Sequence, residues 1–217
     1  MRLIWLIAVL GVAGCTLQAP RTDPTPVKPD PIPQTKGGAP QNTPQLTARQ
    51  AARNFVDVVE TMEPVVERAC RDLTQNLNCD FRIVLDDRPN QPPNAFQTLE
   101  DSGRPVLGFT LSLLRDVRNK DEIAFVFGHE AAHHIRGHLP RQQQNAQAGA
   151  AVFGILAAGL GIDPASSGVL DIGAAVGARS YSKEFELEAD QLGAILTQRS
   201  GFDPVLGAEY FNRIPDP

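Results

Sequence analysis

The folded part of the chain opens with a long helical pattern of apolar and polar positions. Thr47 and Gln50 form a capping-box pattern at its start. Pro64 should kink or split the helix, because proline lacks an amide proton and crowds the preceding turn. The apolar positions recur every three or four residues, as on one helix face that supplies core side chains: Phe55, Val58, Val59, Met62, Val65, Val66, Ala69 and Leu73.

The pattern then changes to alternation, which is typical of half-buried strands. Residues 81–85 alternate between apolar and polar side chains. After a proline-rich loop, residues 94–99 and 104–110 are predicted to form two strands joined by a turn at 101–103. The second of these leads almost directly into the next helix.

Residues 121–140 read DEIAFVFGHEAAHHIRGHLP and predict a buried helix that Pro140 should end. His129 and His133 are four residues apart, so both imidazoles lie on one face and can converge on one metal ion. Glu130 lies beside that pair, where a carboxylate can activate water. His134 and His138 have the same spacing on another face. They indicate either a second metal site or, as we favour, packing and hydrogen bonds near the first.

Residues 146–178 are rich in alanine and glycine. The first apolar stretch, of about 17 residues, is shorter than the ~20 that a membrane-spanning helix needs, and Asp163-Pro164 interrupts the segment. We therefore predict two helices packed closely through small residues, rather than insertion into a bilayer. Whether their surface touches lipid or covers a cleft stays open.

A further helical stretch, residues 181–196, carries carboxylates that complement the histidines. Glu186 and Asp190 are four residues apart and share a helix face. Catalytic zinc takes three protein ligands and leaves one position for water, so Glu186 is the expected third ligand. Asp190 is expected to accept a hydrogen bond from a ligating histidine, which would fix its tautomer. Glu188 should point elsewhere, into solvent.

The beginning of the chain reads as an export signal. Residues 1–14 have the features of a lipoprotein signal peptide, with Arg2 before an apolar run that ends just ahead of Cys15. Cys15 is predicted to be lipidated, and an ordinary secretory signal is the alternative. Residues 15–45 are proline-rich and poor in hydrophobes, as in an extended tether.

Residues 46–217 are long enough for one domain with one core. Cys70 and Cys79 remain once Cys15 is assigned to lipid, and in an exported chain they indicate a disulfide, with two buried thiols as the alternative. The net charge of -5, without a basic patch among aromatics, gives no sign of a nucleic-acid surface.

The ordered motifs resemble the HtpX and CAAX prenyl protease type of zinc metallopeptidase, in particular its BepA-like periplasmic members. The resemblance implies a mostly helical, zincin-like α+β domain with a small sheet beside the HExxH helix. It implies one Zn2+ per chain on His129, His133 and Glu186, with Glu130 as the catalytic base. The matching segments are Pro93-Asn94-Ala95-Phe96, His129–His133 with Gly137-His138, Tyr181–Gly193 and Gly201-Phe202-Asp203-Pro204.

The resemblance also implies a function. We expect a zinc-dependent endopeptidase for unfolded or misassembled envelope proteins. Thr16 after Cys15, in place of aspartate, resembles the arrangement in lipoproteins of Gram-negative bacteria and implies a periplasmic protein anchored to the outer membrane. The alternative is a zinc-stabilised lipoprotein that binds such clients without cleaving them.

Two details of the family's site need local equivalents. Relatives carry a downstream histidine-proline and an arginine, whereas here no histidine follows His138; Tyr181 or Tyr210 is considered as a donor to the oxyanion. In peptidases of this type a strand placed like residues 104–110 often pairs with an extended substrate, and an ordinary covered edge is the alternative.

Overall fold

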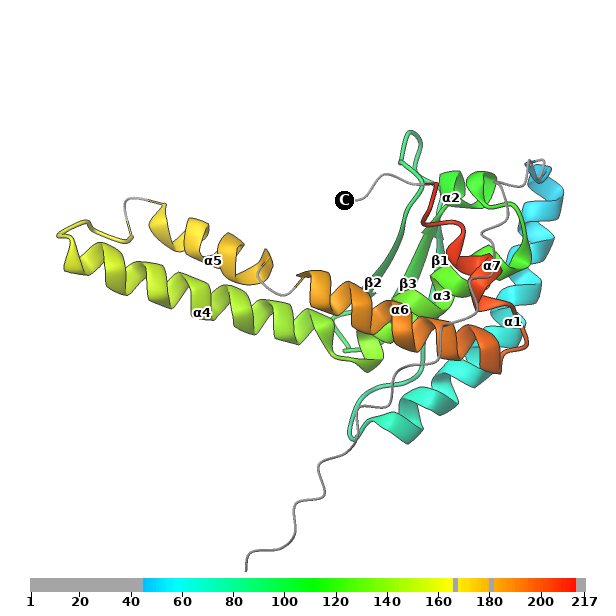
Figure 1. The fold of residues 1–217 in the computed structure, drawn as a ribbon, viewed down its shortest axis with the longest axis horizontal. Coiled ribbons are helices and arrows are strands. Elements are labelled where there is room, and N and C mark those ends of the chain that lie inside the picture. Colours follow the sequence, from blue (N-terminus) through cyan, green and yellow to red (C-terminus); the bar gives the residue numbers. More distant parts are fainter. Residues whose placement is uncertain (1–44, 166–167, 180–181, 214–217) are drawn as a thin grey trace, which may run out of the picture. The chain divides into compact units, whose positions relative to one another are not determined.

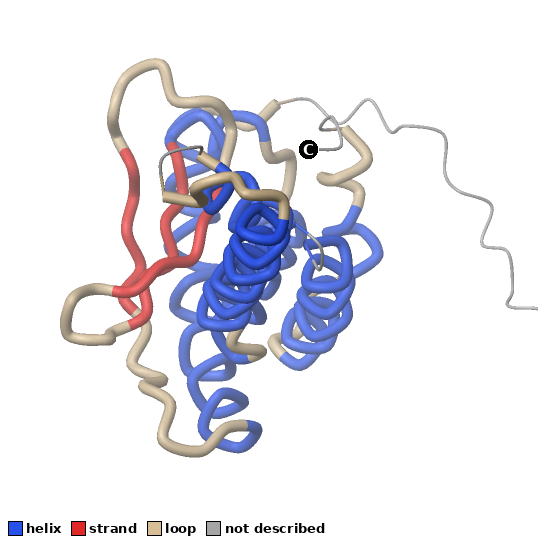
Figure 2. Tube along the Cα trace, turned by 90° about the vertical axis from the view of Figure 1, so that its left-hand side faces the viewer, coloured by secondary structure: helices blue, strands red, loops and turns tan. Residues whose placement is uncertain are grey.

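The computed structural model describes residues 45–165, 168–179 and 182–213. The signal peptide, Cys15, most of the tether and Tyr181 lie outside these residues. The described chain forms seven helices and one three-stranded sheet, which confirms a mostly helical α+β fold (Figure 1). Figure 2 shows the strands gathered on one side of the helices.

Helix α1 (Ala48–Leu73) starts at the predicted capping box: Thr47 accepts from the Gln50 amide, and the Gln50 side chain accepts from the Thr47 amide. Pro64 lies inside this helix and does not split it, so of the two predicted effects only a kink is compatible with the structure. Pro64 is on the exposed face, where water can serve the carbonyl that loses its amide partner. The opposite face packs into the core.

The sheet contains β1 (Arg82–Asp86), β2 (Ala95–Leu99) and β3 (Pro105–Thr110) in the order β1-β3-β2. Strand β3 pairs in parallel with β1 and antiparallel with β2. The strand expected beside a substrate, residues 104–110, is therefore central, and β2 is an edge strand. Strand β3 is buried at every position, as expected for a central strand that is covered on both sides.

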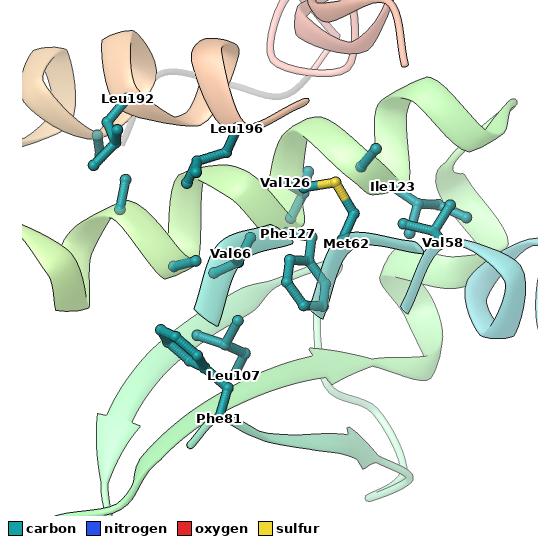
Figure 3. Close-up of a cluster of buried hydrophobic side chains, with 14 of the residues drawn as sticks. Val58, Met62, Val66, Phe81, Leu107, Ile123, Val126, Phe127, Leu192 and Leu196 are labelled. Atoms are coloured by element: carbon teal, nitrogen blue, oxygen red, sulfur yellow. The ribbon is translucent and has the colours of Figure 1, made fainter. Parts of the chain in front are cut away.

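Helix α3 (Lys120–Ile135) is the centre of the packing. It contacts α1 and the sheet as well as α6 (Ser182–Arg199) and α7 (Pro204–Ala208), while the short α2 (Leu111–Asp116) joins it to β3. Nearly every α3 side chain is buried, as expected for a helix that is apolar all round. Figure 3 shows the shared core, which includes Val58, Met62, Val66, Phe81, Leu107, Ile123, Val126, Phe127, Leu192 and Leu196.

Helix α4 (His138–Gly159) follows after one residue in the left-handed conformation, Gly137 at φ 65°. Pro140, which was predicted to end the preceding helix, instead lies in the first turn of α4, where its missing amide proton costs no hydrogen bond. The correction has a local cause: Gly137 ends α3 earlier and redirects the chain.

Helices α4 and α5 (Val169–Arg179) pack against each other, as the small residues predicted. A Cβ atom on Gly149 would collide with the carbonyl of Gly173 and lie 2.9 Å from the Cα of Gly177. Within the described chain, no helix combines the length and apolar character that crossing a bilayer requires.

A disulfide joins Cys70, in the last turn of α1, to Cys79, just before β1, with the two Cα atoms 5.8 Å apart. Both residues are buried in the main core. The bond therefore ties the end of α1 to the start of the sheet.

Candidate active site

The site forms where α3 crosses α6 at two glycines. A Cβ atom on Gly128 would lie 2.8 Å from the carbonyl oxygen of Gly193, and one on Gly193 would lie 2.9 Å from the amide nitrogen of His129. The two backbones are therefore in contact. Asp190 and Glu186 lie about one and two turns before Gly193, so the crossing brings both carboxylates to His129.

Three side chains converge at this crossing. The Nε2 atoms of His129 and His133 are 3.0 Å apart, and the Glu186 Oε2 atom lies 3.2 Å from the first and 3.7 Å from the second. Tetrahedral zinc with bonds of ~2.0–2.1 Å places its ligand atoms ~3.3–3.4 Å apart, so the three distances bracket this value. Two imidazoles and a carboxylate also form a donor set that zinc accepts. Within the described part of the chain, His129, His133 and Glu186 form a group that could hold a metal ion.

Asp190 orients the first histidine. Its Oδ1 lies 2.9 Å from Nδ1 of His129. A carboxylate only accepts, so the Nδ1–H of His129 donates and, in the neutral ring, Nε2 keeps its lone pair. The sequence predicted this arrangement.

A second chain of hydrogen bonds orients the other histidine. Nδ1 of His133 lies 2.8 Å from Nδ1 of His138, whose Nε2 lies 3.1 Å from Oε2 of Glu188. Burial lowers the pKa of His138, so its ring is neutral at pH 7. Nε2 of His138 donates to Glu188, so Nδ1 of His138 must accept from Nδ1 of His133. This leaves Nε2 of His133 with its lone pair.

Glu188 is therefore bonded to protein side chains, although its own side chain remains 37% exposed to solvent as the sequence suggested. Arg141, on α4, donates to both carboxylate oxygens of Glu188 at 2.7 and 3.2 Å. These hydrogen bonds, and then the one from His138, lower the pKa of Glu188 to about 2. Phe185 stacks on the His138 ring at 4.6 Å, and the Arg141 guanidinium lies 4.3 Å from the Phe185 ring centroid.

His134 belongs to a different environment. Its Nε2 donates to the carbonyl of Asn78 at 2.7 Å, and its ring lies edge-on to Phe81. His134 and His138 therefore have separate partners. This supports packing and hydrogen bonding, which the sequence favoured over a second metal site.

The converging atoms of His129, His133 and Glu186 repel one another unless a positive charge lies between them. Two nitrogen lone pairs and a carboxylate face one another, so a cation is needed between them. Burial opposes a charge on His129, but the hydrogen bonds to Asp190 and Glu186 outweigh it and raise its pKa to about 9. Burial and the neighbouring His129 lower the pKa of His133 to about 4. Without metal, one proton on His129 meets the requirement.

Glu130 lines a pocket of about 180 Å³ beside the converging atoms of His133 and Glu186. Burial, with a smaller contribution from Glu186, raises the pKa of Glu130 to about 7, although His129 opposes the shift. The walls come from β2, α3, α4 and α6: Gln97, Glu130, His133, His138, Leu139, Gln142, Ser182, Phe185 and Glu186. Periodicity singled out His138 but gave no sign of Leu139, Gln142 or Gln97, because only the tertiary packing brings them to the HExxH helix.

Tyr210, which was considered as a donor to the oxyanion, does not line this pocket. Tyr210 is buried in the main core, and its hydroxyl has no hydrogen-bond partner among the described residues. Arg213 forms two hydrogen bonds with Glu122, at 2.7 and 2.6 Å, near the start of α3. The idea that Tyr210 acts in the site is thus contradicted by its position, and Tyr181 lies outside the described residues.

Comparison with known proteins places this geometry in a family. Residues 57–211 match the description "Peptidase family M48". The beta-barrel assembly-enhancing protease of Escherichia coli K12 is 30% identical over 113 residues, and that of Yersinia pestis is 32% identical over 114. Each match covers 48% of this chain but only 23% of the relative, so the chain spans about a quarter of these curated proteins. The family match includes every residue of the candidate site, and the chain belongs to peptidase family M48.

Proposed function

We propose that the protein is a zinc-dependent endopeptidase that hydrolyses peptide bonds in unfolded or misassembled proteins of the cell envelope. The observation that carries the proposal is the convergence of His129, His133 and Glu186 beside the pocket that Glu130 lines. Membership of peptidase family M48 supports the hydrolytic activity.

His129, His133 and Glu186 would hold the metal. Zinc would supply a Lewis acid that polarises the scissile carbonyl and makes a nearby water more acidic. Glu130 would accept a proton from the attacking water and deliver it to the leaving amine, so that one water adds across the broken C–N bond. Asp190 and His138 would hold the two imidazoles in the orientation and tautomer that this requires.

The electrostatic environment of Glu130 suits both halves of that proton transfer. In the metal-free site the pKa of Glu130 is about 7, so this carboxyl group can take up a proton and release it again near neutral pH. Placing the same carboxylate in open solvent would make it a weaker base. The pocket therefore supplies the burial that raises the basicity of Glu130.

The cellular setting follows from the chain's first residues and from the relatives. We propose that Cys15 is lipidated and that residues 15–45 hold the domain off the periplasmic face of the outer membrane. The matching relatives are named as proteases that enhance beta-barrel assembly, which supports envelope proteins as substrates.

Turnover separates this proposal from a lipoprotein that binds clients without cutting them. The purified full chain should cleave unfolded casein, and a chelator should stop the reaction until zinc is restored. Glu130→Gln should bind zinc normally and lose cleavage, whereas Glu184→Gln, an exposed carboxylate on α6, should retain both. Zinc binding without any cleavage by the wild type would favour the non-cleaving alternative.

A further inference from the structure

A second pocket, of about 570 Å³, lies next to the one that contains Glu130. The two pockets share Leu139 and Gln142 in the first turns of α4. We propose that the second pocket is a substrate subsite for an uncharged, apolar side chain on the N-terminal side of the scissile bond. This inference rests on the proposed peptidase function and adds a substrate preference to it.

The lining of the second pocket determines what it can accept. Every lining residue is uncharged, and most of the surface is hydrocarbon: Thr98, Leu99, Leu139, Pro140, Gln142, Gln143, Ala146 and Ala178. A charged side chain placed there would lose water without gaining an ionic partner from the lining, which is unfavourable. An apolar side chain would instead cover Leu99, which is 43% exposed, and gain from its burial.

Strand β2 connects the two pockets with a regular spacing. Gln97 is paired with Leu107 of β3 and Leu99 with Pro105, so both β2 side chains lie on the same face of the sheet. Gln97 lines the pocket with Glu130, and Leu99 lines the second pocket. Two residues along a strand correspond to ~6.6–6.8 Å, which is also the repeat of a bound extended peptide.

The free side of β2 offers a template for such a peptide. Among the described residues, β2 pairs with β3 alone, which leaves its other edge open (Figure 1). A peptide added to a sheet edge gains affinity from main-chain hydrogen bonds and specificity from pockets for alternate side chains. Antiparallel pairing is the more stable choice.

The direction in which a peptide pairs with β2 determines which of its residues enters the second pocket. Strand β2 runs from Gln97 to Leu99, so an antiparallel peptide runs from the second pocket towards Glu130. The side chain in the second pocket therefore comes two residues before the one that faces Gln97. An apolar residue there should favour binding over aspartate by at least about tenfold, the discrimination that a hydrophobic pocket provides.

Binding can be measured separately from cleavage. The zinc-loaded full chain carrying Glu130→Gln is titrated with fluorescent ten-residue peptides in which one leucine is moved, or replaced by aspartate, along an otherwise alanine sequence. We expect one position where aspartate weakens binding at least tenfold. Adding Ala146→Lys should reduce this preference or reverse it in favour of aspartate. Adding Ala148→Lys, an exposed position two residues further along α4 and outside the lining of the second pocket, should leave it unchanged.

Cleavage by the wild type then locates the preferred position relative to the broken bond. A preference up to about three residues before that bond supports the proposal. Equal affinity for leucine and aspartate peptides, an equal effect of the two lysine variants, or a preference only after the bond would overturn it. If the binding preference and its loss in Ala146→Lys are found but no peptide is cleaved, the second pocket stands as a binding site for an apolar side chain of a peptide, whereas the endopeptidase proposal fails.

Discussion

Each imidazole of the candidate site must present the correct nitrogen to a metal, and single residues decide which one it is. Asp190 fixes the ring of His129 through Nδ1. Glu188 acts at longer range, because it sets the tautomer of His138, which in turn sets that of His133. The carboxylate that looked solvent-exposed in the sequence is thus the last acceptor of a hydrogen-bond chain from the site.

Removing His138 tests the role of the hydrogen bonds that run from His133 through His138 to Glu188. His138→Ala should lower zinc affinity 10–100-fold, because His133 would lose the acceptor that orients it. The measurement is competition for zinc against a chelator of known affinity. His134→Ala is the matched control: it removes a buried histidine bonded to Asn78 and should reduce the free energy of unfolding without changing zinc affinity. Equal zinc affinities for His138→Ala and the wild type would contradict the orienting role.

Zinc affinity should also depend on pH through His129. Its pKa is raised to about 9, so the metal-free site holds this proton at pH 7 and zinc must displace it. Affinity should therefore rise by about tenfold per pH unit from pH 7 and level off near pH 9, as expected for the release of one proton. In Asp190→Asn the carboxylate that supports the proton is gone, so the plateau should begin at lower pH. Affinity independent of pH between 7 and 9 would contradict this.

At the scale of elements, the site depends on how closely α3 and α6 approach. The contact at Gly128 and Gly193 leaves no room for a methyl group on either residue. A wider crossing would move Glu186 and Asp190 away from His129 together. Helix separation thus controls the ligand geometry.

Gly193→Ala tests that dependence. The added methyl group should force the helices apart, lower the free energy of unfolding by about 1–3 kcal/mol and weaken zinc binding. Gly159→Ala, where a new Cβ atom meets nothing within 4 Å, is the matched control and should neither lower the free energy of unfolding nor weaken zinc binding. Denaturant unfolding and zinc competition measure the two effects, and unchanged zinc affinity in Gly193→Ala would show that the close crossing is not needed.

The disulfide between α1 and the start of the sheet is a second element-scale feature. Replacing Cys70 and Cys79 together with alanine should lower the free energy of unfolding by roughly 2–3 kcal/mol, mainly by freeing the unfolded chain. The site should keep its zinc affinity, because neither cysteine contributes to the pocket. Denaturant unfolding under oxidising conditions measures the change; stability equal to that of the wild type would contradict it.

Local sequence patterns predicted the helices and strands better than they predicted where a helix ends or which distant segments it contacts. The capping box at Thr47 and the four-residue spacing of His129 and His133 depend on neighbours in the sequence, and both could be predicted. Pro140 could not be placed, because Gly137 turns the chain before it. The central position of β3 and the pairing of Arg141 with Glu188 depend on contacts between distant segments, which periodicity does not contain.

At the scale of the whole molecule, chain segments from β2 to α6 meet around one point. The pocket with Glu130 and the second pocket share a wall on α4, so metal binding, the proposed hydrolysis and the proposed substrate preference all depend on the same packing. Arg141 strengthens this arrangement by linking the first turns of α4 to Glu188 on α6.

The central claim is that His129, His133 and Glu186 hold one zinc ion. The most direct measurement is the zinc content per chain of the purified protein after gel filtration, compared with Glu186→Ala and Glu130→Gln. The account predicts one zinc ion per chain in the wild type and in Glu130→Gln, and a large loss in Glu186→Ala. A wild type without zinc, or a Glu186→Ala variant that retains its full complement, would contradict it.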